Sequence, residues 1–123
     1  MSFLNKIFGG SEENSASTFW KYIKSEEDLE KAIAESFEKK VVIFKHSTRC
    51  FISKTVLSGF EREVQNSDKD VSYYFLDLIA YRAISNKIAD DFGVEHQSPQ
   101  LIVLENGVAV RNTSHNNISL SVI

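Results

Sequence analysis

The chain has 123 residues and a formal net charge of −3 at pH 7, with 42% hydrophobic and 25% charged residues. This composition is that of one globular domain, and it excludes a second core of ordinary size as well as a disordered or fibrous chain. The acidic balance argues against nucleic acid as the main partner, and no apolar run approaches the roughly 20 residues that cross a bilayer.

The first 18 residues read as a tail and linker. Four apolar side chains near the start recur at helical spacing, and a polar stretch follows them: Phe3, Leu4, Ile7 and Phe8. A secretory signal needs roughly 7–15 continuous apolar residues, which this segment lacks. We therefore expect residues 1–18 to form a tail that packs on its own domain or is disordered, and we prefer this reading to a membrane anchor. Residues 19–123 are expected to form the folded domain.

The folded part begins with a short extended segment at 19–23 and a helix that starts after Ser25. Ser25 is a good N-cap, and Asp28 stands three residues later in the capping-box position. The helix is expected to end near Glu38, with a buried stripe formed by residues spaced four apart: Leu29, Ile33 and Phe37. Residues 41–44 are continuously apolar, which is typical of a strand covered on both faces in the middle of a sheet.

A second helical pattern starts directly after Cys50. Its apolar stripe contains Ile52, Val56 and Phe60, with Leu57 and Val64 beside it. Residues 71–78 then read as a buried strand. A third helix is marked by Ala80, Ile84, Ile88 and Phe92, and Gly93 is expected to end it in a left-handed conformation.

The last part of the chain predicts a hairpin. Two apolar runs, 101–104 and 108–110, flank the pair Asn106-Gly107, the strongest short hairpin signal. Residues 114–123 are read as a last short helix, against which their β-branched residues argue. The resulting order, β-α-β-α-β-α-β-β, predicts an α/β sandwich with parallel strands first and an antiparallel hairpin added to the same mixed sheet.

Cysteine occurs once, as Cys50. A single cysteine excludes an internal disulfide and suits a reducing compartment. Cys50 lies between a buried strand and a helix, so we expect it at the carboxyl edge of the sheet, where backbone N–H groups and the helix dipole favour thiolate over thiol. The alternative is a small buried hydrophobe, the common role of a free cysteine. The junction position and the polar residues before Cys50 favour the reactive role.

Two other positions bear on this site. Ser53 stands one helical turn after Cys50, where it either donates a hydrogen bond to the thiolate or is an exposed first-turn serine. A C-x-x-S motif cannot form its own disulfide and needs an external thiol. The single proline, Pro99, follows Ser98 in the loop that enters a strand; a cis bond there would free the Ser98 backbone for a substrate, although only about 5–6% of X-Pro bonds are cis.

The sequence contains no motif for binding a metal ion or a phosphate group. No pair among the three histidines and Cys50 has the spacing of metal ligands: His46, His96 and His115. Only one thiolate is available, and no Gly-rich phosphate loop is present. We therefore expect no metal site.

The string Phe-Lys-His-Ser-Thr-Arg-Cys that ends at Cys50, with Ile52 and Ser53 after it, resembles the monothiol bacilliredoxin (YtxJ) family of the bacillithiol system, within the thioredoxin-like superfamily. The strand and helix order from about residue 19 to residue 111 fits as well. The resemblance implies a thioredoxin-like fold, a cytoplasmic bacterial setting and a cis proline at Pro99.

The resemblance further implies a monothiol disulfide reductase. Cys50 would remove a low-molecular-weight thiol such as bacillithiol from S-thiolated client proteins, and a second molecule of that thiol would release it; no cofactor, nucleic acid or membrane takes part. The implied catalytic residues are Cys50 and Ser53. The implied substrate-binding residues are Lys45, His46, Thr48, Arg49, Phe51, Ser98 and Pro99, of which Lys45, His46 and Arg49 would form a basic rim that attracts carboxylates.

The chain departs from the superfamily at Phe51, where redox motifs often have proline; we expect this to change the exposure of the thiol and the start of the helix. Two other functions stay open. One is a non-catalytic thioredoxin-like binding or stress-associated module that docks a partner in the groove beside Cys50 and Pro99. The other is peroxide reduction, because Ser47 stands three positions before Cys50 as in a peroxidatic S-x-x-C, although the proline and length typical of such enzymes are missing.

Overall fold

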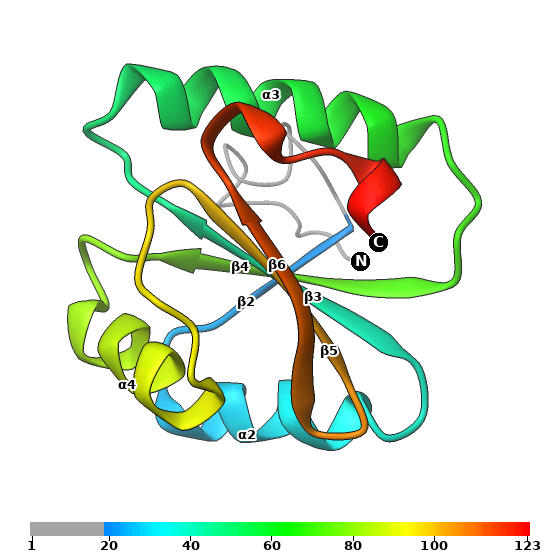
Figure 1. Ribbon diagram of the computed structural model, residues 1–123, viewed down its shortest axis with the longest axis vertical. Helices are drawn as coiled ribbons and strands as arrows, with labels where there is room; N and C mark the ends of the chain where they lie inside the picture. The colour runs from blue at the N-terminus through cyan, green and yellow to red at the C-terminus, as the bar shows by residue number, and fades with distance from the viewer. Residues whose placement is uncertain (1–18) are drawn as a thin grey trace, which may run out of the picture.

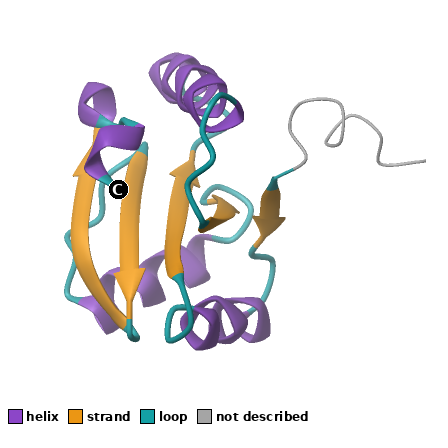
Figure 2. Cartoon of the chain, turned by 90° about the vertical axis from the view of Figure 1, so that its right-hand side faces the viewer, coloured by secondary structure: helices purple, strands orange, loops and turns teal. Residues whose placement is uncertain are grey.

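The computed structural model describes residues 19–123, so the expected tail and linker at 1–18 lie outside the described residues. One mixed sheet is covered by helices on both faces (Figure 1, Figure 2). The elements in chain order are β2 (Trp20–Tyr22), α2 (Glu26–Glu35), β3 (Lys40–His46), α3 (Phe51–Gln65), β4 (Val71–Asp77), α4 (Arg82–Phe92), β5 (Gln100–Glu105), β6 (Val108–Ser114) and the 3₁₀ helices η1 (His115–Asn117) and η2 (Leu120–Val122). This is the order that the sequence predicts.

The strands follow the spatial order β2-β4-β3-β5-β6, with β3 in the middle as expected. The pairs β2–β4 and β3–β4 are parallel, whereas β5 runs antiparallel to both β3 and β6. Side chains of β3 alternate between two apolar clusters. Val41 and Ile43 pack with α2 and α4 on one face, and Val42 and Phe44 pack with α3 on the other.

Three left-handed backbone positions fall where the sequence predicts them. Gly93 ends α4 with φ 63° and ψ 35°. Asn106 and Gly107, with φ of 54° and 82°, join β5 to β6. Positive φ at both central residues is the requirement of the two-residue turn that matches the twist of a hairpin.

The predicted stripe of α2 is wrong at its end, because α2 stops at Glu35 and the Phe37 side chain is 62% exposed. Ser36 ends the helix by binding the hairpin turn: its carbonyl accepts the Asn106 N–H at 2.8 Å and its hydroxyl accepts the Gly107 N–H at 2.9 Å. The Phe37 ring then lies over Gly107, where a β-carbon would stand 2.7 Å from it. The beginning of the helix is as predicted, since the Ser25 hydroxyl accepts the Asp28 N–H.

The predicted stripe of α3 is wrong at its start, because Ile52 is 50% exposed and Ser53 is buried in its place. Phe60 and Val64 are buried as expected. At about 100° per residue, Ser53 lies within about 20° of the direction of Phe60, whereas Ile52 is about 80° away from it. Because Ser53 is polar, the apolar pattern does not reveal that it belongs to the buried face of the helix, and it assigns Ile52 to that face instead. Ala80, expected in the third helix, lies exposed in the turn before α4.

The predicted final helix is also wrong. Residues 114–123 instead form η1 and η2, whose neighbours Ile118 and Ile123 are buried against the α3 side of the sheet. A hydrogen bond to α3 also holds this segment in place, since the Leu120 N–H donates to Glu63 Oε1 at 2.8 Å. Apolar anchoring rather than helix length therefore covers this part of the sheet.

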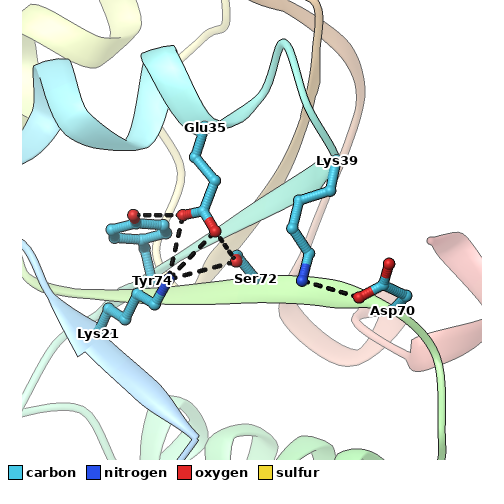
Figure 3. Close-up of polar contacts among 6 residues, drawn as sticks. All are labelled: Lys21, Glu35, Lys39, Asp70, Ser72 and Tyr74. Atoms are coloured by element: carbon cyan, nitrogen blue, oxygen red, sulfur yellow. Dashed lines mark hydrogen bonds and ion pairs between the residues drawn. The ribbon is translucent and has the colours of Figure 1, made fainter.

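A polar network ties three elements together at the edge of the sheet where β3 and β4 begin (Figure 3). The Glu35 carboxylate at the end of α2 accepts hydrogen bonds from the hydroxyls of Ser72 and Tyr74 on β4 and from Lys21 on β2. Burial alone would raise the pKa of Glu35, but these donors together hold it below its usual value of 4.5. Burial and the bond to Glu35 raise the pKa of Tyr74.

Glu35→Gln should lower the free energy of unfolding at pH 7 by about 1–2 kcal/mol, because two hydroxyls and an ammonium lose a charged acceptor. A lowered folded-state pKa stabilises the fold above the unfolded pKa, and this contribution is lost as the pH falls below 4.5. Urea unfolding at pH 7 and pH 3 measures both effects. The matched control is the exposed Glu38→Gln; a Glu35→Gln variant no less stable than this control at pH 7 would contradict the network's role.

Candidate functional site

Cys50 is the N-cap residue of α3 and follows the carboxyl end of β3. Its backbone is extended, with φ −106° and ψ 120°, and its carbonyl accepts the Lys54 N–H at 3.1 Å. No side chain caps the first turn of α3, and the thiol is half-buried. The sulfur therefore lies at a free helix N-terminus, where the backbone stabilises a negative charge.

Ser53 is fully buried and binds the loop before Cys50. Its hydroxyl lies 2.8 Å from His46 Nδ1 and accepts the Ser47 N–H at 3.1 Å. Between residues 19 and 123 no hydrogen bond joins Ser53 to the Cys50 sulfur, so neither the expected thiolate donor nor an exposed serine is found. Ser53 instead fixes the turn that connects β3 to Cys50.

His46 is the buried partner of that serine, with 5% of its surface exposed. Its ring packs between Phe44 and Phe75 at centroid distances of 6.4 Å and 5.5 Å. Burial lowers the pKa of His46; Asp77 acts in the opposite direction and Lys54 adds to the lowering. A neutral, enclosed imidazole is not available to attract a carboxylate from solvent.

Lys45 is also inside the domain, with none of its surface exposed. It points to the opposite face of β3 and donates from Nζ to the Ser85 carbonyl of α4 at 3.1 Å. Burial, helped by the charge of Arg82, lowers the pKa of Lys45 to about 8. The expectation of a surface rim formed by Lys45, His46 and Arg49 is therefore wrong for its first two members, because both complete β3 as buried residues.

The remaining predicted residues before and after Cys50 are on the surface. Thr48 and Arg49 are exposed in the connecting turn. Phe51 is 79% exposed and stands beside the exposed Ile52, so Cys50 is flanked by apolar surface. Helix α3 begins at Phe51 without a proline.

The Ser98–Pro99 peptide bond is cis, as the resemblance implies. The antiparallel register pairs Lys45 with Gln100, which places Pro99 at the same end of the sheet as His46 and the turn to Cys50. Pro99 is buried, and its carbonyl accepts the His115 N–H at 3.0 Å. The Ser98 hydroxyl oxygen is buried without a hydrogen-bond partner in the described part of the chain.

The sequence analysis does not identify the buried polar side chains that contact the segment before Pro99. Gln100 is fully buried, donates from Nε2 to the Glu95 carbonyl at 2.9 Å and accepts the Gln97 N–H at 3.4 Å. Ser85 Oγ lies 3.5 Å from His96 Nδ1. One sequence signal could have identified these buried polar residues: each directly adjoins an apolar run predicted to be a buried strand. Lys45 follows residues 41–44, and Gln100 precedes residues 101–104.

Across residues 19–123, no three His, Cys, Asp or Glu side chains are grouped so that they could hold a metal ion. Within the same residues, no helix is long and apolar enough to span a membrane.

A family model described as "Monothiol bacilliredoxin BrxC" matches residues 21–123. A solved structure described as a candidate oxidoreductase with a thioredoxin fold is 31% identical, covers 84% of this chain and 88% of that chain, and has a TM-score of 0.74. The thioredoxin of Malassezia sympodialis is 20% identical, with 80% and 79% of the two chains covered and a TM-score of 0.63. The thioredoxin of Fasciola hepatica is 18% identical, with 77% of this chain and 86% of that chain covered and a TM-score of 0.61. The predicted α/β thioredoxin-like fold is confirmed.

Ser53→Ala should destabilise the protein by about 1–3 kcal/mol, because the Ser47 N–H and the His46 ring lose their buried partner. Chemical unfolding measures this loss. Ser58→Ala, an exposed serine on the same helix, is the matched control and should change the stability by less than about 0.5 kcal/mol. Equal stabilities of the two variants would show that Ser53 does not hold the turn.

Proposed function

Because the chain belongs to the monothiol bacilliredoxin family, which gives it a thiol–disulfide redox role, we propose that Cys50 removes a low-molecular-weight thiol from protein mixed disulfides. The position of Cys50 carries this proposal. The only cysteine of the chain stands half-buried at the uncapped N-terminus of a 15-residue helix. Backbone N–H groups at a helix N-terminus favour an anionic sulfur in general, and a half-buried sulfur in that position is open to attack a disulfide.

The reaction consists of two exchanges. In the first, the Cys50 thiolate attacks the small-thiol sulfur of the mixed disulfide, a Cys50–small-thiol disulfide forms, and the client cysteine leaves as a thiolate. In the second, the thiolate of another small-thiol molecule attacks that disulfide, a symmetrical small-thiol disulfide forms, and the Cys50 thiolate is restored. Electrons balance, since the client sulfur is reduced to a thiol, the second small thiol is oxidised, and the first small-thiol sulfur passes from one disulfide to the next without a change of oxidation state.

The residue three positions after Cys50 supports the need for an external thiol. Ser53 occupies the place where a dithiol enzyme has its second cysteine, and its hydroxyl is engaged by His46 and Ser47. No residue of this chain can therefore release the client or the adduct by forming an internal disulfide. A bacillithiol-like thiol is the co-substrate that the family suggests, and a reducing compartment such as the bacterial cytoplasm is the expected setting.

The surroundings of Cys50 suggest how substrates are held. The backbone of Ser98, before the cis Pro99, would pair with the peptide or thiol bound next to the sulfur. Arg49 and Thr48 are exposed in the turn and would contact polar groups of the small thiol, while Phe51 would contact the client protein. Ser53 acts on the reaction through the turn that it fixes.

The test is adduct formation at Cys50. Wild-type protein incubated with an S-bacillithiolated client should release the client thiol and gain the mass of one bacillithiol, and excess bacillithiol should remove that mass. Cys50→Ser should do neither. Mass spectrometry measures both species, and a wild-type Cys50 that stays unmodified under native conditions would contradict the proposal.

A docking module without catalysis is the second candidate, and the exposed Phe51 and Ile52 beside Cys50 favour it. It differs from the reductase in one measurable respect. Client binding that persists in Cys50→Ser, together with no exchange by the wild type, would replace the reductase by this candidate.

A further inference from the structure

A continuous chain of hydrogen bonds joins His46 to the backbone of Cys50. His46 Nδ1 lies 2.8 Å from Ser53 Oγ, and the same oxygen accepts the Ser47 N–H at 3.1 Å. The Ser47 carbonyl in turn accepts the Cys50 N–H at 3.2 Å, and the Cys50 carbonyl accepts the Lys54 N–H at 3.1 Å. The imidazole is therefore linked to the turn that carries the sulfur through Ser53 and Ser47.

The Ser53 hydroxyl decides which nitrogen of the imidazole carries the proton. A hydroxyl has one proton to donate and two lone pairs that accept. One lone pair accepts the Ser47 N–H, and within residues 19–123 the only other hydrogen-bond partner of this hydroxyl is His46 Nδ1. Because Ser53 is fully buried, a hydroxyl proton that pointed elsewhere would be unsatisfied. The hydroxyl therefore donates to Nδ1, and the neutral ring holds its own proton on Nε2.

Protonation of the ring reverses this hydrogen bond. A proton on Nδ1 makes that nitrogen a donor, so the Ser53 oxygen then accepts two N–H groups and its own proton loses its acceptor. The new charge is also enclosed, because His46 is 5% exposed and its ring packs between Phe44 and Phe75. Both changes weaken the contact that holds the turn before Cys50.

Charged groups act on the ring from both elements that pack against it. Burial is the largest influence and lowers the pKa of His46 below its usual value of 6.5. Asp77 on β4 acts in the opposite direction, and Lys54 on α3 adds to the lowering. The ring is therefore neutral at pH 7 and takes up a second proton only in more acidic solution.

We propose that His46 is a positioning residue for the exchange at Cys50: the neutral ring holds Ser53 and the turn in place, and protonation of the ring slows the exchange. No hydrogen bond joins His46 to the sulfur in the described part of the chain, so its effect passes through Ser53. The inference rests on the proposed function, since it names a residue that regulates the same reaction. It gives the histidine before Cys50 a role other than attracting carboxylates.

Nitrogen NMR of the wild-type protein tests the assignment of the proton without any substitution. The ¹⁵N shifts of the His46 ring, identified by their absence from His46→Asn, should show a protonated Nε2 and an unprotonated Nδ1 at pH 8. The same signals followed down to pH 4 give the pKa of the ring. A ring that carries its proton on Nδ1 at pH 8 would overturn the assignment.

The reaction of Cys50 with 2,2′-dipyridyl disulfide tests the effect on exchange. The Cys50 thiolate attacks one sulfur of the reagent, a mixed disulfide forms, and the other half leaves as 2-thiopyridone. The measured quantity is the rate constant of His46→Asn divided by that of the wild type, because the ionisation of Cys50 enters both. The asparagine oxygen accepts as Nδ1 does but takes up no proton in this range. The ratio should lie within about twofold of one at pH 8 and rise to about fivefold as the pH falls through the pKa of the ring.

Two controls separate this role from a general effect of the substitution. His115→Asn makes the same change at an exposed histidine and should react as the wild type does at every pH. In protein that already carries Ser53→Ala, His46→Asn should change the rate by less than about twofold, because the contact is already lost. Circular dichroism at each pH verifies that every variant is folded.

The remaining outcomes each decide the proposal. A ratio that stays flat while NMR shows the ring titrating, or a ring that does not titrate above pH 4, overturns the control by protonation. A ratio that falls in acid also overturns it, because His46 would then act by its charge on the Cys50 thiolate and not through Ser53. A ratio that rises as expected, in a protein that does not release an S-bacillithiolated client, supports the role of His46 and contradicts the proposed function.

Discussion

The central strand β3 must end with two polar side chains inside the domain, and the rest of the site follows from how each is satisfied. Alternation sends Lys45 to the α4 face and His46 to the α3 face. Lys45 donates to the backbone of Ser85, and His46 pairs with Ser53, which also accepts the Ser47 N–H. Buried polar groups are costly unless they are hydrogen-bonded, so both pairings fix the end of β3. The fixed end of β3 in turn places Cys50 at the N-cap of α3.

The two ends of the central strands differ in how completely their polar groups are paired. Where β3 and β4 begin, Glu35 joins α2, β2 and β4 through paired donors and acceptors (Figure 3). Where the same strands end, α3 and α4 begin without a side-chain cap, and the Ser98 hydroxyl before the cis Pro99 has no hydrogen-bond partner within residues 19–123. Unsatisfied donors near the single cysteine are consistent with the thiol–disulfide redox role of the family.

The sequence predicted the order of the elements, the central position of 41–44, the hairpin at Asn106 and the left-handed end at Gly93, because each has a local signal. It did not predict which polar residues are buried. Lys45 and His46 read as surface charges and Ser53 as a contact of the sulfur, since a single sequence does not show that His46 and Ser53 meet across a strand-to-helix turn. The apolar spacing places Phe37 and Ile52 in the core, but the neighbouring serines, Ser36 and Ser53, occupy the buried positions instead.

The proposed reaction depends on the fold holding Cys50 accessible at the uncapped N-terminus of α3. The rate of its alkylation by iodoacetamide at pH 7, compared with that of a peptide of residues 47–53 under the same conditions, tests this directly. Cys50 in the folded protein should react several-fold faster, because the fold leaves the sulfur open at a helix N-terminus, a position that favours reactive cysteines. A rate equal to that of the peptide, or slower, would contradict it.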